Sequence, residues 1–124
     1  MVFIAVTQDD TAALDLMLDR GLSPDHAAQD GHTGLMSAAS HGLEAPLLLL
    51  LGRGADPNLV EKPSGMTALM YAAIADPGHP RLVQALVRAG ARLDVRSSDG
   101  LTAADYAAKY GHPHLLEALR SPTR

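Results

Sequence analysis

One segment recurs along the chain at a nearly constant interval. It reads DGHTGLMSAASHG from Asp30, SGMTALMYAA from Ser64 and DGLTAADYAA from Asp99. The three threonines, Thr33, Thr67 and Thr102, are 34 and 35 residues apart. A period of this size is typical of proteins that stack one small supersecondary unit several times. The interval therefore restricts the fold to a repeat architecture.

Each recurring segment begins with the signals of a short helix. Threonine favours the N-cap because its side-chain oxygen accepts a hydrogen bond from a backbone N–H of the first turn. We therefore expect Thr33, Thr67 and Thr102 to precede short first helices formed by residues 36–40, 70–75 and 105–110. Alanine pairs at 38–39, 72–73 and 107–108 mark the point where neighbouring copies should pack most closely.

A second helix is expected in each copy from apolar residues at helical spacing. The stripes consist of Leu14, Met17 and Leu18; Leu47, Leu50 and Leu51; Leu82, Val83, Leu86 and Val87; and Leu115, Leu116 and Leu119. Gly21, Gly54 and Gly90 then stand where a residue with left-handed backbone ends a helix with little strain.

Helices this short cannot bury an apolar stripe alone, so the copies must stack against one another. The sequence predicts an all-α solenoid of four helix-turn-helix repeats joined by hairpin-like loops, forming a single domain over residues 1–124. We place the copies at residues 1–27, 28–61, 62–96 and 97–124, with the first and last as caps.

The composition fits a packed domain and excludes several functions. Apolar residues make up 47% of the chain and charged residues 19%. The net charge of −4 argues against a nucleic-acid partner, because phosphate binding needs clustered Lys and Arg. The absence of cysteine removes disulfides, thiolate nucleophiles and thiolate metal ligands.

Neither a targeting segment nor a membrane span is expected. The first residues, MVFIAVTQDD, lack the basic start and the cleavage site of a secretory signal. The longest apolar run, Leu47 to Leu51, is too short to cross a bilayer. We therefore expect a soluble, cytoplasmic protein that has no membrane partner.

The recurring residues resemble the ankyrin repeat over essentially the whole chain. The second copy is nearest to the family pattern, with twelve positions in register: Gly31, Thr33, Leu35, Ala38, Ala39, Gly42, Leu50, Leu51, Gly54, Ala55, Asp56 and Asn58. The resemblance implies the ankyrin solenoid. The richness in Ala, Leu, Gly, Arg and Pro leads us to expect a small, free-standing bacterial member.

The chain departs from the family pattern at three places. The proline after the threonine is replaced by Gly34, Ala68 and Ala103, and the following histidine by Met36, Met70 and Asp105. In the family that histidine ties the loops to the helices, so its loss predicts less rigid loops. The third copy has two extra residues between its helices and one more in its hairpin, at residues 74–78 and 61–64. Insertions of this kind often lie on the binding side.

The resemblance also implies a concave surface of loop tips and first helices that binds a partner protein. The residues at its variable positions are Gln29, Asp30, His32, Ser40 and His41; Ser64, Met66, Ile74 and Asp76; and Ser98, Asp99, Leu101, Lys109 and Tyr110. The alternative for any one of them is a tolerant surface position. Tyr110 stands out, since an exposed tyrosine near Met66 and Ile74 would suit an interface hot spot.

Three other residues do not follow from the stripes alone. Tyr71 and Tyr106 occupy the position of Ser37, and we expect them to pack between copies with their hydroxyls directed outward. Leu48 aligns with Asp15, Gln84 and Glu117, which are solvent-facing choices. We hypothesise that Leu48 is exposed on the second-helix face and marks a secondary contact or self-association patch. The alternative is a single surface leucine without function.

Metal binding and catalysis are not expected. His79 and His112 fall at the family's Gly-His position, and His112 and His114 do not share a helical face as metal ligands would. The sequence contains no nucleophile elbow and no phosphate-binding glycine loop. We interpret Asp9, Asp10 and Asp94 as turn and cap residues. No cofactor is expected.

The sequence thus leaves two hypotheses for function. The first is a protein-protein interaction module that acts as a monomer or weak homo-oligomer. The alternative is an immunity or inhibitor protein that blocks a cognate toxin or enzyme, for which the acidic tips at Asp30, Asp76 and Asp99 suit a basic target. Capture of the partner distinguishes the two.

Overall fold

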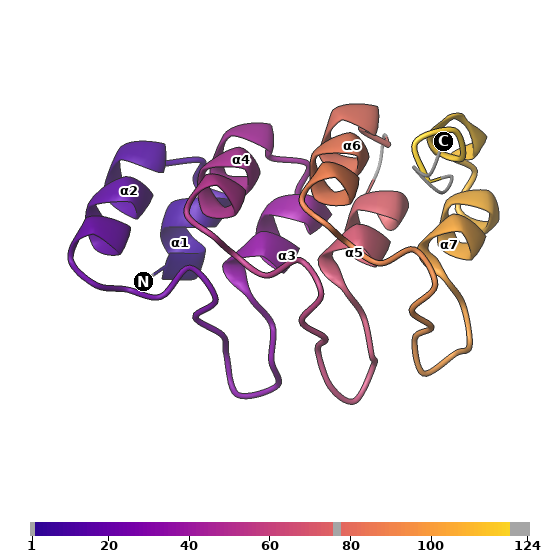
Figure 1. Cartoon of the computed structure of the whole chain (residues 1–124), viewed down its shortest axis with the longest axis horizontal. Coiled ribbons are helices and arrows are strands. Elements are labelled where there is room, and N and C mark those ends of the chain that lie inside the picture. Colours follow the sequence, from indigo (N-terminus) through magenta and orange to yellow (C-terminus); the bar gives the residue numbers. More distant parts are fainter. Residues whose placement is uncertain (1, 76–77, 120–124) are drawn as a thin grey trace.

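The computed structural model describes residues 2–75 and 78–119. In chain order its helices are α1 (Val2–Thr7), α2 (Thr11–Asp19), α3 (Gly34–Ser40), α4 (Glu44–Gly52), α5 (Ala68–Ile74), α6 (Pro80–Arg88), α7 (Ala103–Lys109) and the 3-10 helix η1 (Pro113–Leu115). Figure 1 shows α1, α3, α5 and α7 in one row and α2, α4 and α6 in a second row, with long loops projecting away from both. The predicted all-α solenoid is confirmed.

The first helices begin where the threonines predict. The hydroxyls of Thr33 and Thr67 accept hydrogen bonds from the backbone N–H groups of Met36 and Met70, both at 3.2 Å. Thr102 accepts from Asp105 N at 3.3 Å, and the Asp105 carboxylate accepts from Thr102 N in return. Because the helix starts directly after each cap, α3, α5 and α7 begin two residues before the alanine-rich segments that we had assigned to them.

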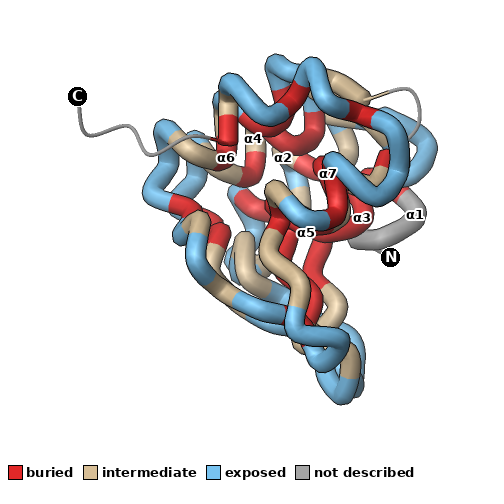
Figure 2. Tube along the Cα trace, turned by 90° about the vertical axis from the view of Figure 1, so that its right-hand side faces the viewer, coloured by how far each residue is buried: buried red, intermediate tan, exposed pale blue. Residues whose placement is uncertain are grey.

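The second helices bury the predicted apolar stripes. Leu14, Leu47 and Leu86 are fully buried, and the core runs continuously from the first copy to the last. Figure 2 shows the buried segments gathered where the helices meet and the exposed ones on the loops and on the outer sides of the helices. None of the described helices is long and apolar enough to span a lipid bilayer.

The last copy departs from the predicted stripe. Its second element is the short 3-10 helix η1 followed by turns, which packs against α7 and α6. Leu115 and Leu119 lie on the packed side and are buried, whereas Leu116 is exposed. The prediction of three inward-facing leucines was therefore wrong for Leu116, because the spacing assumed a regular α-helix.

The stack is closest between the first helices. Ala38, Ala39, Ala72 and Ala73 are almost fully buried, and α3 packs against α5 as α5 packs against α7. In the third alanine pair Ala107 is buried and Ala108 exposed. Small side chains allow the helices to approach closely. The predicted close packing at the alanine pairs is therefore confirmed for α3 and α5, each of which has a first helix of a neighbouring copy on either side.

The loops between copies form hairpins, which we name hairpin 1 (residues 20–33), hairpin 2 (residues 53–67) and hairpin 3 (residues 89–102). They start from Gly21, Gly54 and Gly90, whose φ angles of +101°, +91° and +99° confirm the predicted left-handed helix ends. Each hairpin is closed by a backbone bond across its arms: Ala28 N to His32 O, Glu61 N to Met66 O and Ser97 N to Leu101 O.

Hairpins 1 and 2 pack backbone against backbone at Gly31. A Cβ on Gly31 would lie 2.9 Å from Val60 O of hairpin 2, whereas a Cβ on the equivalent Gly100 would meet no atom within 4 Å. Both glycines have positive φ, +91° and +79°. Comparing alanine substitutions at Gly31 and Gly100 therefore separates two free-energy costs, that of a left-handed backbone and that of a methyl group pressed against the neighbouring hairpin.

We predict that Gly31→Ala destabilises the fold more than Gly100→Ala. The left-handed backbone should cost each variant about 1–2 kcal/mol of unfolding free energy. Gly31→Ala should lose about 1–3 kcal/mol more, because its methyl group overlaps the neighbouring backbone. Urea unfolding followed by circular dichroism measures both. Equal losses would show that the hairpins do not pack closely in solution.

Side chains also join successive copies at the ends of the second helices. Asn58 donates from Nδ2 to Gly90 O at 3.0 Å and accepts from Arg92 N through Oδ1 at 2.8 Å. The equivalent Asp25 accepts only one such bond, from Asp56 N at 2.7 Å. Arg53 pairs with both Asp15 and Asp19 of the preceding copy. Asn58 therefore joins hairpin 2 to hairpin 3 through one donated and one accepted hydrogen bond.

We predict that Asn58→Ala lowers the unfolding free energy by about 1–3 kcal/mol, since it removes two hydrogen bonds worth about 1 kcal/mol each. Asp25→Ala, which removes one, should cost roughly half as much. Thermal unfolding of the two variants beside the parent chain tests the order. A smaller effect for Asn58→Ala than for Asp25→Ala would contradict it.

Candidate functional site

The three hairpins are held in register by backbone hydrogen bonds between their tips. Lys62 N of hairpin 2 donates to Asp30 O of hairpin 1 at 2.7 Å, and Ser98 N of hairpin 3 donates to Ser64 O of hairpin 2 at 2.7 Å. These bonds occur at equivalent places in the repeat. The tips therefore form one continuous edge along the stack.

Each hairpin is also bonded to its own first helix through one helical position. Four residues after the capping threonines stand Ser37, Tyr71 and Tyr106. The Ser37 hydroxyl lies 2.8 Å from His32 Nε2, Tyr71 donates to the Glu61 carboxylate, and the Tyr106 hydroxyl lies 2.6 Å from Ser97 Oγ. These contacts tie each hairpin to its first helix, as the histidine of the family pattern is expected to do. The prediction of less rigid loops is therefore not supported.

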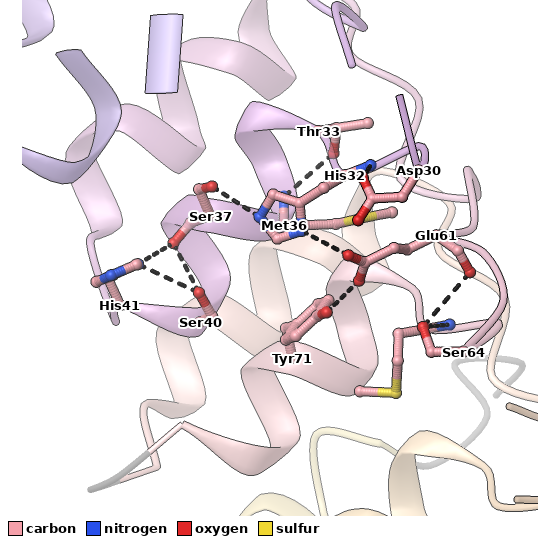
Figure 3. Close-up of polar contacts among 11 residues, drawn as sticks. Asp30, His32, Thr33, Met36, Ser37, Ser40, His41, Glu61, Ser64 and Tyr71 are labelled. Atoms are coloured by element: carbon pink, nitrogen blue, oxygen red, sulfur yellow. Dashed lines mark hydrogen bonds and ion pairs between the residues drawn. The ribbon is translucent and has the colours of Figure 1, made fainter. Parts of the chain in front are cut away.

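Figure 3 shows the best-developed of these contacts, between hairpins 1 and 2 and α3 and α5. His32 bridges from Ser37 to Glu61, with Nδ1 3.3 Å from Glu61 Oε2, and its ring meets the Tyr71 ring edge-on at a centroid distance of 5.6 Å. Burial of the phenol, together with the hydrogen bond to the Glu61 carboxylate, raises the pKa of Tyr71. Tyr71 therefore remains a neutral donor at physiological pH.

The order Ser37, His32, Glu61 is that of a hydrolytic triad, but the serine is badly placed for chemistry. Its side chain lies in α3 and the residue is only 5% exposed. A nucleophile must be reachable by substrate and must face donors for the developing oxyanion. We interpret the three residues as a brace between hairpins and helices.

Two exposed carboxylates are fixed by backbone donors. The N–H of His32 donates to Asp30 Oδ1 at 3.1 Å and lowers the pKa of the Asp30 carboxyl. The N–H of Thr102 donates to Asp105 Oδ2 at 3.0 Å and lowers the pKa of Asp105. Both side chains therefore present a negative charge in a defined position.

Most of the predicted partner-binding residues lie in the hairpin tips or at the ends of the first helices, and we name the surface of these two regions the tip surface. The exposed members are Gln29, Asp30, His41, Ser98, Asp99, Lys109 and Tyr110, and the partly exposed members are His32, Ser40, Ser64, Ile74 and Leu101. Tyr110 is 49% exposed, with Lys109 Nζ 5.9 Å from its ring centroid. Asp76 lies outside the described residues.

Met66 was wrongly predicted as a surface residue. It is 8% exposed and belongs to the core. Gly65 turns the chain with a φ of +72° and packs against the backbone of Ser97 and Ser98, which places the next side chain inside the stack. Because Met66 is buried, it does not form an exposed patch with Tyr110 as we had expected. The aromatic neighbour of Tyr110 is Tyr106, at a ring-centroid distance of 6.3 Å.

Two residues that anchor the hairpins, Glu61 and Ser97, were not predicted from the sequence. Both lie ahead of a capping threonine, six and five residues before it, and both bond the tyrosine four residues after it. The recurrence of a polar residue opposite each tyrosine was the available signal. In the described ranges no group of three His, Cys, Asp or Glu residues is placed to hold a metal ion.

The comparisons identify the repeat. Residues 2–73 and 35–123 match the family model described as ankyrin repeats in three copies. Human Ankyrin repeat and KH domain-containing protein 1 is 40% identical over 100 residues, covering 80% of this chain and 4% of the relative. Mouse Ankyrin repeat domain-containing protein 63 is 32% identical over 111 residues, covering 86% of this chain and 28% of the relative.

A third relative, Ankyrin repeat and KH domain-containing protein mask-1 of Caenorhabditis elegans, is 33% identical over 117 residues, covering 94% of this chain and 4% of the relative. The chain thus spans a small part of the length of each of these relatives. All three are animal proteins, so they do not support the bacterial, free-standing origin that we had expected. The chain belongs to the ankyrin-repeat family, whose repeats are protein-interaction modules.

Proposed function

We propose that this chain binds a partner protein through its tip surface, without catalysing a reaction. The observation that carries the proposal is the double attachment of the hairpins, which are bonded to one another at their tips and to their own first helices. A surface ordered before binding loses less entropy when a partner docks. Side chains that differ from copy to copy are thus held on a fixed frame.

The chemistry of the tip surface suits protein recognition. Tyr110 offers an exposed ring with an ammonium group beside it, and tyrosine is among the side chains that carry most of the binding energy in interfaces. Asp30 and Asp99 are exposed on hairpins 1 and 3. Such charges steer encounter and fix the register of a partner more than they add affinity.

The inhibitor hypothesis has no specific observation in its favour. The names of the relatives mention ankyrin repeats and KH domains, and none of them mentions a toxin or an immunity protein. The acidic residues at the hairpin tips are equally expected at surface positions that tolerate many residue types, so they do not favour an inhibitor. We therefore retain the interaction module as the proposed function.

We predict that a tip variant, Asp30→Ala with Asp99→Ala and Tyr110→Ala, loses its partner. The tagged chain serves as bait in an extract of the cells that produce it, and captured proteins are quantified by mass spectrometry. Removing a hot-spot tyrosine costs about 2 kcal/mol or more of binding free energy, so recovery of a specific partner should fall at least about tenfold.

The matched control replaces three exposed residues outside the tip surface, with Gln8→Ala, Arg92→Ala and Asp94→Ala. It should recover the partner as the parent chain does. Equal recovery by all three baits would exclude the tip surface, and loss in the control alone would place the interface elsewhere. Circular dichroism of both variants ensures that a loss is not caused by unfolding.

A further inference from the structure

The second-helix layer, formed by α2, α4 and α6, has a charge pattern that the tip surface does not use. Counted with the residue that caps each end, α2 has Asp10, Asp15 and Asp19 against Arg20, and α4 has Glu44 against Arg53. The corresponding count for α6 has Arg81 and Arg88 with no acidic residue. With His79 neutral, the net charge runs from −2 through 0 to +2 across the three helices.

Exposed leucines accompany this pattern. Leu48 in α4 is 46% exposed and Leu16 in α2 is 52% exposed, which confirms the expected exposure of Leu48. Leu48 also lines a groove of about 290 Å³ between α4 and α6, together with Glu44, Arg81, Gln84, Ala85 and Arg88. An apolar side chain in the middle of the layer, beside two arginines, is the arrangement of a small contact surface.

We propose that the second-helix layer docks onto the same layer of a second copy of this chain, related by a two-fold axis near Leu48. The charge pattern is antisymmetric about α4. A two-fold axis that lies in the interface and runs parallel to α4 therefore places the acidic α2 of each copy against the basic α6 of the other. In a two-fold dimer each copy contributes the same patch, so the contact between an acidic α2 and a basic α6 occurs twice.

The opposite pairing is disfavoured. Stacking the layers with α2 over α2 would bring two acidic helices together and two basic helices together, and like charges across an interface are costly. The carboxylates of Asp15 and Asp19 keep 48% and 59% side-chain exposure although both pair with Arg53. One guanidinium offsets one of the two charges, so α2 still attracts a cation.

The size of the layer predicts a weak dimer. Nine-residue helices are about 13 Å long and neighbours lie about 10 Å apart, so the layer offers about 400 Å² per copy. The total of about 800 Å² is below the roughly 1,200 Å² of stable interfaces. Association should therefore be transient and should weaken as salt screens the charged pairs.

Such a dimer leaves both tip surfaces free. The hairpins project away from the second-helix layer in Figure 1, so two copies joined through that layer present their tips on opposite sides. A bivalent binder gains avidity for a partner that carries two binding sites. This gain in avidity rests on the proposed function, whereas the dimer itself does not.

Sedimentation equilibrium of the parent chain tests the dimer between about 10 µM and about 1 mM protein, at about 50 mM and about 500 mM NaCl. We expect the average mass to rise toward that of a dimer with concentration, and to rise less at high salt. Arg88→Glu should weaken association at least about tenfold, because it reverses one charge pair in each half of the dimer. Arg92→Glu makes the same change of net charge outside the layer and should leave association unchanged.

Cross-linking locates the axis. The chain has no cysteine, so Leu48→Cys and Val60→Cys each introduce a single exposed thiol, the second of them on hairpin 2. With a short bis-maleimide, Leu48→Cys should form covalent dimer at least about tenfold faster than Val60→Cys if the axis lies near residue 48. A monomer at every concentration, equal effects of Arg88→Glu and Arg92→Glu, or equal cross-linking rates would each overturn the proposal.

Discussion

The stacking of copies is the contact on which everything else in this molecule depends. A single pair of helices cannot bury its apolar stripe alone, because the described α-helices are only six to nine residues long and η1 is shorter still. Alanines at the first-helix contact let α3, α5 and α7 approach closely, and the second helices fill the remaining space with leucine. The same approach brings successive hairpins together, so core packing and the geometry of the tip surface have one cause.

The hairpins show how a repeat can lose a family residue and keep its architecture. Where the histidine of the family pattern is replaced by Met36, Met70 and Asp105, the methionines are buried in the core and the aspartate completes a capping box. Ser37, Tyr71 and Tyr106 then take over the bond between helix and hairpin, each with a different partner. The position of the bond is constant although its chemistry varies.

The sequence could predict what depends on local spacing. Threonine caps, alanine contacts, leucine stripes and left-handed glycines all follow from residue type and interval, and the structure confirms them with the exception of Leu116 and Ala108. Met66 could not be placed in this way, because its burial depends on how hairpin 2 packs on hairpin 3. Glu61 and Ser97 were missed for a similar reason, since their partners lie across a turn and the interval to the tyrosine differs between copies.

The central claim is that the hairpins form one ordered edge, and amide hydrogen exchange of Lys62 and Ser98 tests it most directly. Both amides lie on exposed residues and donate to the neighbouring hairpin at 2.7 Å. If the hairpins are joined in solution, both amides should exchange at least about 100-fold more slowly than in an unstructured peptide. Exchange at the unstructured rate would show that the tips move independently and that the tip surface is not formed before binding.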